Sequence, residues 1–321
     1  MRIALTGVGH WHAPMHLDAI RAAGAEPAGA WDPDPAVAVA FAAANGLAAA
    51  PSLGALLAGR PDLVIAMGHP SDVSATARAI LAAGLPMVLE KPAASRSDEL
   101  AAIAPAPGAF VAVPLANRCS PLWAELDRLR AAGRLGAIGH AHFRIINGPP
   151  ERYRVDRVPW LLDPAIAGGG ALRNLGLHAV DAALQIFGAA EPALLAATVR
   201  SDLHGEAVDD YALATLALPH GPVVTVETGY TYASMLPGGD YEWRVAAAGA
   251  TLIDRGTSLR VTTLDDGATR DLAPLPSGQR YRAFLADTLA CLRAGRRPLV
   301  DFADYLRAMR LVDAIYTRAA A

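Results

Sequence analysis

The sequence predicts an α/β protein of two domains, the first of which is built on a doubly wound parallel sheet. Residues 2–118 alternate between short apolar strands and alanine-rich helical stretches, which is typical of such a sheet. A glycine turn follows the first strand, and 321 residues are enough for two hydrophobic cores. We place the domains at residues 1–118 and 119–321.

The elements of the first domain follow one another as strand and helix. Strands are expected at residues 2–6, 27–31, 62–67, 86–89 and 110–115, and helices at 13–23, 35–45 and 72–83. Ligands of such sheets bind beyond the carboxyl ends of the strands, so polar residues at those ends are candidate site residues. The positions concerned are Gly7, Asp32, His69 and Lys91.

The composition excludes several classes of function. A net charge of −3 and a pI near 6.3 give no electrostatic basis for binding nucleic acid or an anionic membrane. The two cysteines have neither metal-ligand spacing nor a disulfide framework, and no apolar run reaches the roughly 18 residues of a membrane helix. The chain opens on a strand rather than a signal peptide. We therefore expect a cytoplasmic protein.

The turn after the first strand follows the dinucleotide-binding pattern. Gly7 permits a tight turn, and Gly9 lets the backbone approach a pyrophosphate at the helix N-terminus. Asp32 ends the second strand, where its carboxylate can accept hydrogen bonds from the adenosine ribose. No basic residue follows it to bind a 2′-phosphate, so we expect NAD, with NADP the less favoured cofactor. The other candidate cofactor contacts in this turn are His10, Trp11 and His12. The alternative is an ordinary loop.

Three histidines near this turn raise the alternative of a metal site. They stand at positions 10, 12 and 16, with no nearby cysteine and only Asp18 as an acidic neighbour. Such a set is a poor match to known ligand spacings. We therefore expect no metal and place the histidines in the wall of a cofactor cleft.

One lysine stands among the 28 basic residues, and it lies in Glu90-Lys91-Pro92 at the end of a strand. Arginine serves at every other basic position, although it cannot titrate as a buried lysine amine can. A lone lysine beside a carboxylate therefore indicates a chemical role. The alternative is a surface lysine without one.

A second group of polar residues lies in residues 168–181, where three glycines precede an amphipathic helical stretch. This pattern is typical of a helix N-terminus that lies against a ligand. Asn174 and His178 are four residues apart on one helical face, and Asp181 follows three residues later. One ring nitrogen of His178 can then face a substrate while Asn174 or Asp181 fixes the tautomer. A buried histidine bonded to a backbone carbonyl is the alternative.

In order and spacing, these motifs resemble the Gfo/Idh/MocA oxidoreductases, a family that includes glucose–fructose oxidoreductase and inositol dehydrogenase. The resemblance spans the whole chain and rests on Gly7-x-Gly9, Asp32, Glu90-Lys91-Pro92, Trp160 and residues 168–181. It implies a Rossmann domain followed by an α+β domain with a large open, mostly antiparallel sheet. The matching strands are 139–145, 208–218, 223–231 and 244–248, and the closing helices are 281–294 and 302–319.

The resemblance also implies an activity: transfer of a hydride between NAD and a sugar, cyclitol or related polyol. In that family the lysine matching Lys91 contacts nicotinamide and substrate hydroxyls, and the histidine matching His178 is the usual acid/base. An ammonium group at Lys91 would stabilise the developing alkoxide. The expected catalytic residues are thus Lys91, His178 and Asn174, and the remaining cofactor contacts are Glu90, Pro92 and His69.

Three positions depart from the family pattern. Many members carry aspartate at Asn174, and an amide cannot balance an imidazolium charge. Val73 stands where a histidine is common, and His12 replaces the third glycine of the turn. The first of these departures bears directly on the strength of the expected acid/base.

The expected substrate contacts come from two loops and the helix. Asn117 and Arg118 follow a strand where relatives place polar contacts, and residues 153–160 are polar and aromatic, as in the wall of a sugar site. The full expected set is Asn117, Arg118, Tyr153, Trp160 and Asn174. The alternative for residues 153–160 is a surface crossover with Trp160 as an interface plug.

The strand at 223–231 alternates apolar and polar residues, which leaves one face of its sheet in need of cover. Relatives cover this face by pairing subunits, so a homodimer or homotetramer is expected. Two functional alternatives remain from the sequence. One is a redox-neutral glycosidase that uses bound NAD, and the other is a non-catalytic nucleotide-binding sensor or regulator.

Overall fold

A computed structural model describes residues 1–236 and 238–321, which divide into two compact units. Unit 1 comprises Met1–Ala116 and Ser277–Leu306, and unit 2 comprises Asn117–Pro276 and Arg307–Ala321. The predicted boundary after residue 118 lies close to Ala116, where the chain first passes from unit 1 to unit 2. The prediction differs beyond it, because residues 277–306 were assigned to the second domain and pack with the first.

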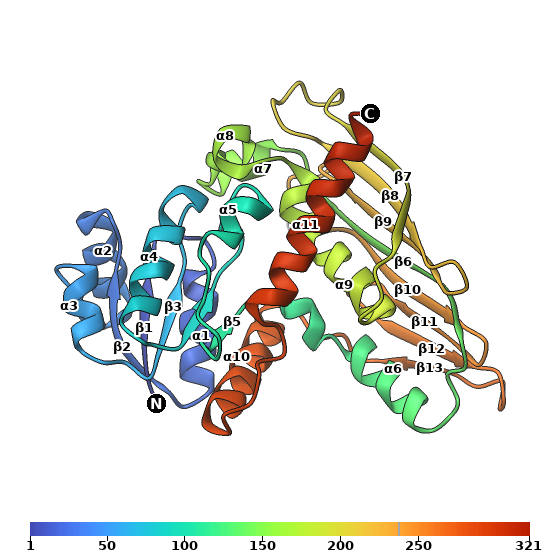
Figure 1. Ribbon diagram of the computed structural model, residues 1–321, viewed down its shortest axis with the longest axis horizontal. Helices are drawn as coiled ribbons and strands as arrows, with labels where there is room; N and C mark the ends of the chain where they lie inside the picture. Colours follow the sequence, from blue (N-terminus) through green and yellow to red (C-terminus); the bar gives the residue numbers. More distant parts are fainter. Residues whose placement is uncertain (237) are drawn as a thin grey trace. The chain divides into compact units, whose positions relative to one another are not determined.

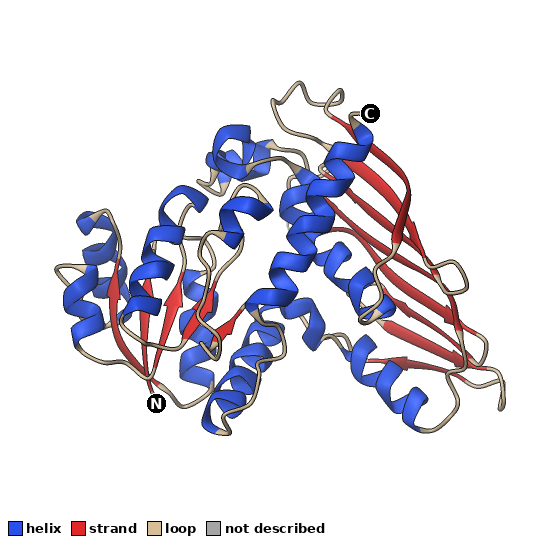
Figure 2. Ribbon diagram, viewed as in Figure 1, coloured by secondary structure: helices blue, strands red, loops and turns tan. Residues whose placement is uncertain are grey.

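Unit 1 is built on a five-stranded parallel sheet with the strand order β2-β1-β3-β4-β5 (Figures 1 and 2). Its strands are β1 Arg2–Thr6, β2 Glu26–Trp31, β3 Leu63–Ala66, β4 Met87–Leu89 and β5 Val111–Ala112. Every residue of β3 and β4 is buried, which is why these strands are continuous apolar runs in the sequence. The predicted doubly wound sheet is confirmed.

The helices of unit 1 include the three that were predicted, with ends shifted by at most two residues. These are α1 Ala13–Ala22, α2 Pro35–Asn45 and α4 Pro70–Ala82. Helix α2 begins where the Asp34 carboxylate accepts a hydrogen bond from Ala36 N, and it ends at Gly46 in the left-handed conformation. Two short helices, α3 Leu53–Ala58 and α5 Ser97–Ala101, were not predicted.

A late segment of the chain completes unit 1. Helix α10, Ser277–Arg293, packs against α1, and an exposed ion pair of 2.6 Å joins Arg282 to Asp18. Val113 N also donates to Val300 O at 3.0 Å, just before the start of α11, Phe302–Ala319. These contacts are the physical reason why residues 277–306 belong to the first unit.

Unit 2 contains an eight-stranded sheet with the order β13-β12-β11-β10-β6-β9-β8-β7. Only the β6–β9 pairing within this described sheet is parallel, so the expected mostly antiparallel sheet is confirmed. The strands that match predicted ones are β6 Ile138–Asn147, β8 Tyr211–Ala217, β9 Val223–Gly229 and β10 Gly239–Ala247. The others are β7 Ala193–Arg200, β11 Ala250–Asp254, β12 Leu259–Thr263 and β13 Thr269–Leu272.

Helices α6, Pro121–Ala131, and α9, Leu177–Phe187, pack on one face of this sheet (Figure 1). Trp123 of α6 forms an aromatic cluster with Phe143 and Trp243 of the sheet, with ring centroids 5.2–6.2 Å apart. Half-buried polar residues that alternate with this core lie on the opposite face, among them His142 and Thr225, whose side chains are 2.6 Å apart.

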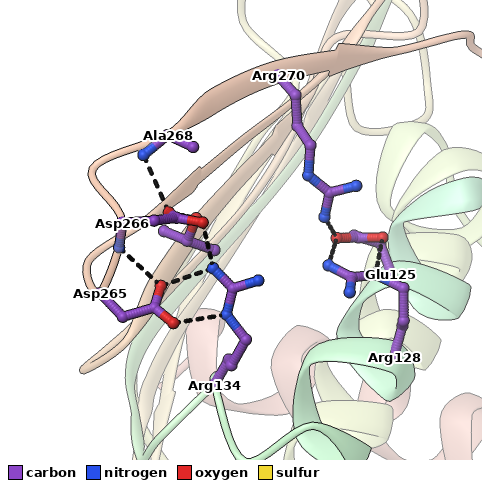
Figure 3. Close-up of polar contacts among 8 residues, drawn as sticks. Glu125, Arg128, Arg134, Asp265, Asp266, Ala268 and Arg270 are labelled. Atoms are coloured by element: carbon purple, nitrogen blue, oxygen red, sulfur yellow. Dashed lines mark hydrogen bonds and ion pairs between the residues drawn. The ribbon is translucent and has the colours of Figure 1, made fainter.

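Ion pairs join the β12–β13 edge of the sheet to α6 and to the residues just after it (Figure 3). Arg134, just after α6, contacts both Asp265 and Asp266 at 2.6 Å, and these two residues form the turn between β12 and β13. Arg270 on β13 pairs with Glu125 of α6. These ion pairs add to the burial of Leu259 and Val261 on the inner strand of the hairpin.

Across residues 1–236 and 238–321, every helix is too short or too polar to cross a bilayer.

Candidate functional site

The glycine turn of unit 1 is a tight passage between β1 and α1. Gly7 has φ +64°, and a Cβ at this position would overlap the carbonyl oxygen of Met67 at the end of β3. Only glycine fits there without moving the sheet. Gly9 lies against Val37 and the Asp32 carboxylate, so the backbone of this turn is pressed onto the carboxyl ends of the central strands.

Asp32 occupies the predicted place at the end of β2. Its Oδ2 accepts a hydrogen bond from Gly9 N at 2.8 Å, and its Oδ1 accepts one from Asp34 N at 3.0 Å. The carboxylate therefore shapes the glycine turn, a role that the sequence did not reveal. Each oxygen keeps a second lone pair, with which it can still accept a hydrogen bond from a ribose hydroxyl.

The N-terminus of α1 has no capping anion of its own. The N-cap residue His12 makes no side-chain cap hydrogen bond, and the first turn contains no acidic residue. The positive end of the helix dipole is thus left for a ligand, which suits a pyrophosphate. Together with Asp32 and the close-packed glycines, this end of unit 1 fits a dinucleotide.

The predicted turn residues His10, Trp11 and His12 form an aromatic group. The His10 ring stacks on Trp11 with centroids 4.6 Å apart and meets His12 edge-on at 5.1 Å. Burial lowers the pKa of His10 well below its usual value, with a further contribution from His12, and burial likewise lowers the pKa of His12. Both rings are therefore neutral near pH 7. No group of three or more potential metal ligands occurs among the described residues.

Glu90 and Lys91 lie at the end of β4 and are buried, with Lys91 only 4% exposed. The Lys91–Pro92 peptide bond is cis. Burial lowers the pKa of Lys91 below its ordinary value, and the charge of Glu90 opposes that shift. The placement confirms that this lysine is not a surface residue. His69, the other predicted residue at a strand end, is exposed at the N-cap of α4, and its cofactor contact stays a prediction.

The glycine run of unit 2 has a structural reason that the sequence did not show. A Cβ at Gly169 would overlap the Tyr316 hydroxyl, and one at Gly170 would overlap the Asp209 backbone. These glycines are therefore required by close packing within the protein, and a ligand at the helix N-terminus stays a prediction. The Asp209 carboxylate accepts hydrogen bonds from Gly170 N at 2.6 Å, Leu172 N at 2.8 Å and Tyr316 Oη at 2.6 Å.

The segment after the glycines begins as a π-helical turn, Leu172–Gly176, and continues as α9. π-Helical turns are rare overall, but those that occur are often found at functional sites. Asn174 lies in it, and its Nδ2 donates to the hydroxyls of Tyr153 at 3.3 Å and Tyr230 at 3.2 Å. The two rings are 4.9 Å apart, and burial raises the pKa of both. Tyr153 was predicted as a site residue, whereas Tyr230, which follows β9, was missed.

His178 is the second residue of α9 and is partly exposed. One turn later Asp181 accepts hydrogen bonds from the buried guanidinium of Arg118 at 2.5–3.2 Å. Asp181 is thus the ion-pair partner of a predicted substrate contact, and Asn174 is bonded to two tyrosines. A role for either in fixing the His178 tautomer stays a prediction.

Two further predicted residues lie in short helical turns. Asn117 belongs to the 3₁₀ turn Ala116–Cys119, where its carbonyl accepts a hydrogen bond from Trp123 Nε1 at 3.1 Å. Trp160 is buried in the 3₁₀ turn Pro159–Leu162. Substrate contact by Asn117, Arg118, Tyr153 and Trp160 stays a prediction.

Comparison with known families agrees with this architecture. Residues 1–108 match the model described as "Oxidoreductase family, NAD-binding Rossmann fold", and residues 123–253 match the "GFO/IDH/MocA C-terminal domain". The chain belongs to the Gfo/Idh/MocA oxidoreductase family. The expected family is thereby confirmed, and with it an NAD-binding Rossmann domain at the N-terminus.

One relative matches a part of this chain. A putative UDP-kanosamine synthase oxidoreductase subunit of Amycolatopsis mediterranei is 32% identical over 197 residues, which are 59% of this chain. That match spans only 52% of the relative, about half its length.

Solved structures resemble the chain over its whole length. UDP-N-acetylglucosamine 3-dehydrogenase from Acidithiobacillus ferrooxidans has a TM-score of 0.80 at 23% identity, with 100% of this chain and 97% of that chain covered. A levoglucosan dehydrogenase in complex with NADH and levoglucosan has a TM-score of 0.86 at 19% identity, with the same coverage. At these identities the likeness establishes the fold.

Proposed function

We propose that this chain is an NAD-dependent oxidoreductase acting on a CH–OH group of a sugar, cyclitol or related polyol. The observation that carries the proposal is the placement of the only lysine, Lys91, which is buried beside Glu90 at the end of β4 in the NAD-binding unit. Two structures of similar fold are sugar dehydrogenases by name, which supports the same substrate class.

Each proposed catalytic residue has a separate task. Oxidation of a secondary alcohol requires loss of the hydroxyl proton as well as the hydride, and we assign proton transfer to His178. The ammonium group of Lys91 stabilises the developing alkoxide. Asn174, an amide, can bind a substrate hydroxyl, but it cannot balance an imidazolium charge. Bound NAD supplies the hydride acceptor.

The preference for NAD over NADP rests on Asp32. Its carboxylate and the neighbouring Asp34 place negative charge where a 2′-phosphate would have to lie. We expect NADP to bind at least about tenfold more weakly than NAD, because like charges repel in a partly desolvated site. Calorimetric titration with both cofactors measures this ratio, and equal affinities would exclude the assignment.

The activity is tested by absorbance of reduced nicotinamide when the protein is mixed with NAD and a panel of inositols, aldoses, sugar acids and nucleotide sugars. Turnover with a member of the panel supports the proposal and names the substrate class. His178→Ala should then lose turnover by about 10²-fold while still binding NAD, since general acid–base catalysis contributes about that factor. A wild-type rate in that variant would show that another residue transfers the proton.

We also propose that the protein forms a homodimer or homotetramer through the polar face of the unit 2 sheet. The support is the row of half-buried residues on that face, including His142, Arg144 and Glu227. Light scattering on the purified protein gives its mass in solution. A monomer at micromolar concentration would contradict this proposal.

A further inference from the structure

The Glu90 carboxylate is a buried charge of unit 1 with several hydrogen-bond partners. Its side chain is only 1% exposed, and polar groups reach it from three separate segments. His16 Nε2 lies 2.6 Å from Oε2, and the Tyr281 hydroxyl lies 3.4 Å from the same oxygen. His12 Nδ1 and Lys91 N lie 3.3 Å and 3.0 Å from Oε1. The partners come from the glycine turn with α1, from the residue that follows Glu90, and from α10.

This surrounding fixes the charge of Glu90. Burial alone would raise the pKa of the carboxyl group, but the interactions with His12 and His16 bring it well below its usual value. A carboxylate that accepts several hydrogen bonds is a poor proton acceptor. Glu90 therefore stays ionised at neutral pH and cannot exchange a proton during a reaction there.

Two of the partners are neutral donors. Burial raises the pKa of Tyr281 well above its usual value and lowers that of His12. His12 Nδ1 lies 2.8 Å from the Tyr281 hydroxyl and 3.3 Å from Glu90 Oε1, so with a proton on Nδ1 it is a donor to this cluster and leaves the hydroxyl proton for Oε2. These hydrogen bonds orient the anion.

Besides the histidines, a further charged partner of Glu90 is the next residue in the chain. Lys91 is buried as deeply as Glu90, and the two interact electrostatically. An isolated ammonium group in such a place would lose its proton, because burial penalises the charged form. The charge of the Glu90 carboxylate favours the protonated amine and so raises the pKa of Lys91.

We propose that Glu90 is a fixed internal counter-charge that keeps Lys91 protonated, and that His16, His12 and Tyr281 are the positioning residues that hold it. Glu90 is then neither a proton carrier nor a cofactor contact. The importance of this pair for turnover rests on the proposed function, but the charge state of Lys91 does not.

Because Lys91 is the only lysine, its charge can be measured directly in the full-length protein. Growth on lysine labelled with ¹⁵N at Nζ and ¹³C at Cε gives one lysine side-chain signal, whose chemical shift reports protonation. In the wild-type protein we expect the protonated form at pH 7. A neutral amine at that pH overturns the proposal without any variant.

Glu90→Gln removes the charge but keeps the shape, so its Lys91 titration midpoint should move to lower pH than in the wild-type protein. Tyr281→Phe removes one hydrogen bond to the Glu90 carboxylate but no charge, so its midpoint should move in the same direction by less than in Glu90→Gln. Equal displacement in both variants would assign the effect to packing and overturn the proposal. Overlay of the Glu90→Gln and wild-type curves would do the same.

Arg282→Gln is the matched control on α10, because it breaks an exposed ion pair one residue from Tyr281. It should leave the Lys91 midpoint unchanged. None of these titrations needs a substrate. The proposal that Glu90 keeps Lys91 protonated is therefore tested independently of the search for turnover.

Discussion

At the scale of single residues, the choice of lysine over arginine at position 91 is the feature with the clearest chemical consequence. The other 27 basic residues are arginine, and an arginine at the end of β4 would be permanently charged. A lysine presents a compact ammonium group whose protonation depends on its surroundings. The burial of Lys91 beside Glu90 is such a surrounding.

Lys91→Arg should therefore lower turnover by about 10²-fold or more, because the planar guanidinium cannot replace the compact ammonium at the reacting hydroxyl. The measurement is the rate of nicotinamide reduction with the substrate found for the wild-type protein. NAD binding in the same sample separates lost chemistry from lost cofactor. Near-normal turnover would show that only positive charge matters at this position.

The buried histidines of the glycine turn predict a pH dependence of stability. The folded-state pKa of His10 is depressed by burial, so the unfolded chain takes up a proton below about pH 6.5 that the folded protein does not bind. Stability is fully present above that pH and falls as the pH drops below it, by up to about 1.4 kcal/mol per pH unit for each such group.

Urea unfolding at several pH values between about 5 and 8 measures this slope. His10→Asn removes one titrating ring and should give a shallower slope over the acid part of the range. His220 lies in an exposed turn, so His220→Asn is the control that should leave the slope unchanged. Equal slopes in all three proteins would contradict the prediction.

At the scale of elements, the end of α7, Glu151–Val155, is formed by an unusual residue. Arg157 has φ +60°, and the chain reverses there through a hydrogen bond from Val158 N to Tyr153 O at 2.8 Å. Glycine usually occupies this position, because a side chain in the left-handed region costs energy. Gly168, with φ +72°, ends the next helix, α8 Pro164–Ala167, in the usual way.

Arg157→Gly should therefore raise the free energy of unfolding by roughly 1 kcal/mol, and Gly168→Ala should lower it by a similar amount. Chemical denaturation of both variants tests the pair. If Arg157→Gly is destabilising, the arginine side chain makes a contact worth more than the backbone strain.

The elements also show which parts of the fold could be predicted from sequence. Helices and strands with long apolar patterns were predicted with small errors at their ends, because burial on one side imposes a period on the sequence. Helix α6 was missed although Leu122, Leu126 and Leu129 have helical spacing after Ser120 and Pro121. Strands β7 and β11 to β13 were also missed. Strands β11 and β12 do alternate in burial, but each has only five residues, and β7 has no buried residue that would impose a period.

Only part of the candidate site could be predicted from the sequence. Residues at strand ends follow from the order of strands, which is why Asp32 and Lys91 could be named. Asp209, Tyr230 and Tyr316 contact the glycine run and Asn174 from distant parts of the chain, and no local pattern marks them. The π-helical turn at Asn174 likewise depends on packing rather than on local propensity.

At the scale of the whole molecule, unit 1 is assembled from two distant stretches of chain. An amphipathic helix does not reveal which core it will cover, so the sequence placed α10 in the second domain. In the structure α10 supplies Tyr281 to the Glu90 cluster, and residues 300 and 301 pair with the end of the parallel sheet. The Rossmann unit is incomplete without them.

Residues 1–116 expressed alone should therefore lack a cooperative unfolding transition and bind NAD weakly or not at all. The same residues joined to residues 277–306 by a flexible linker should regain both properties, because the contacts of α10 and of Val300 are restored. Calorimetry of the two proteins tests this. Full NAD affinity in residues 1–116 alone would show that the late segment is dispensable.

The two outer strands of the unit 2 sheet differ in their capacity for misassembly. Strand β13 carries Arg270 and Asp271, and charged side chains discourage other strands from joining an exposed edge. Strand β7 at the other edge reads Ala-Leu-Leu-Ala-Ala-Thr-Val-Arg, with Leu195 53% exposed. Aggregation during heating should start at β7, and Leu195→Lys should delay turbidity, whereas Leu264→Lys, at an exposed site beyond β12, should not.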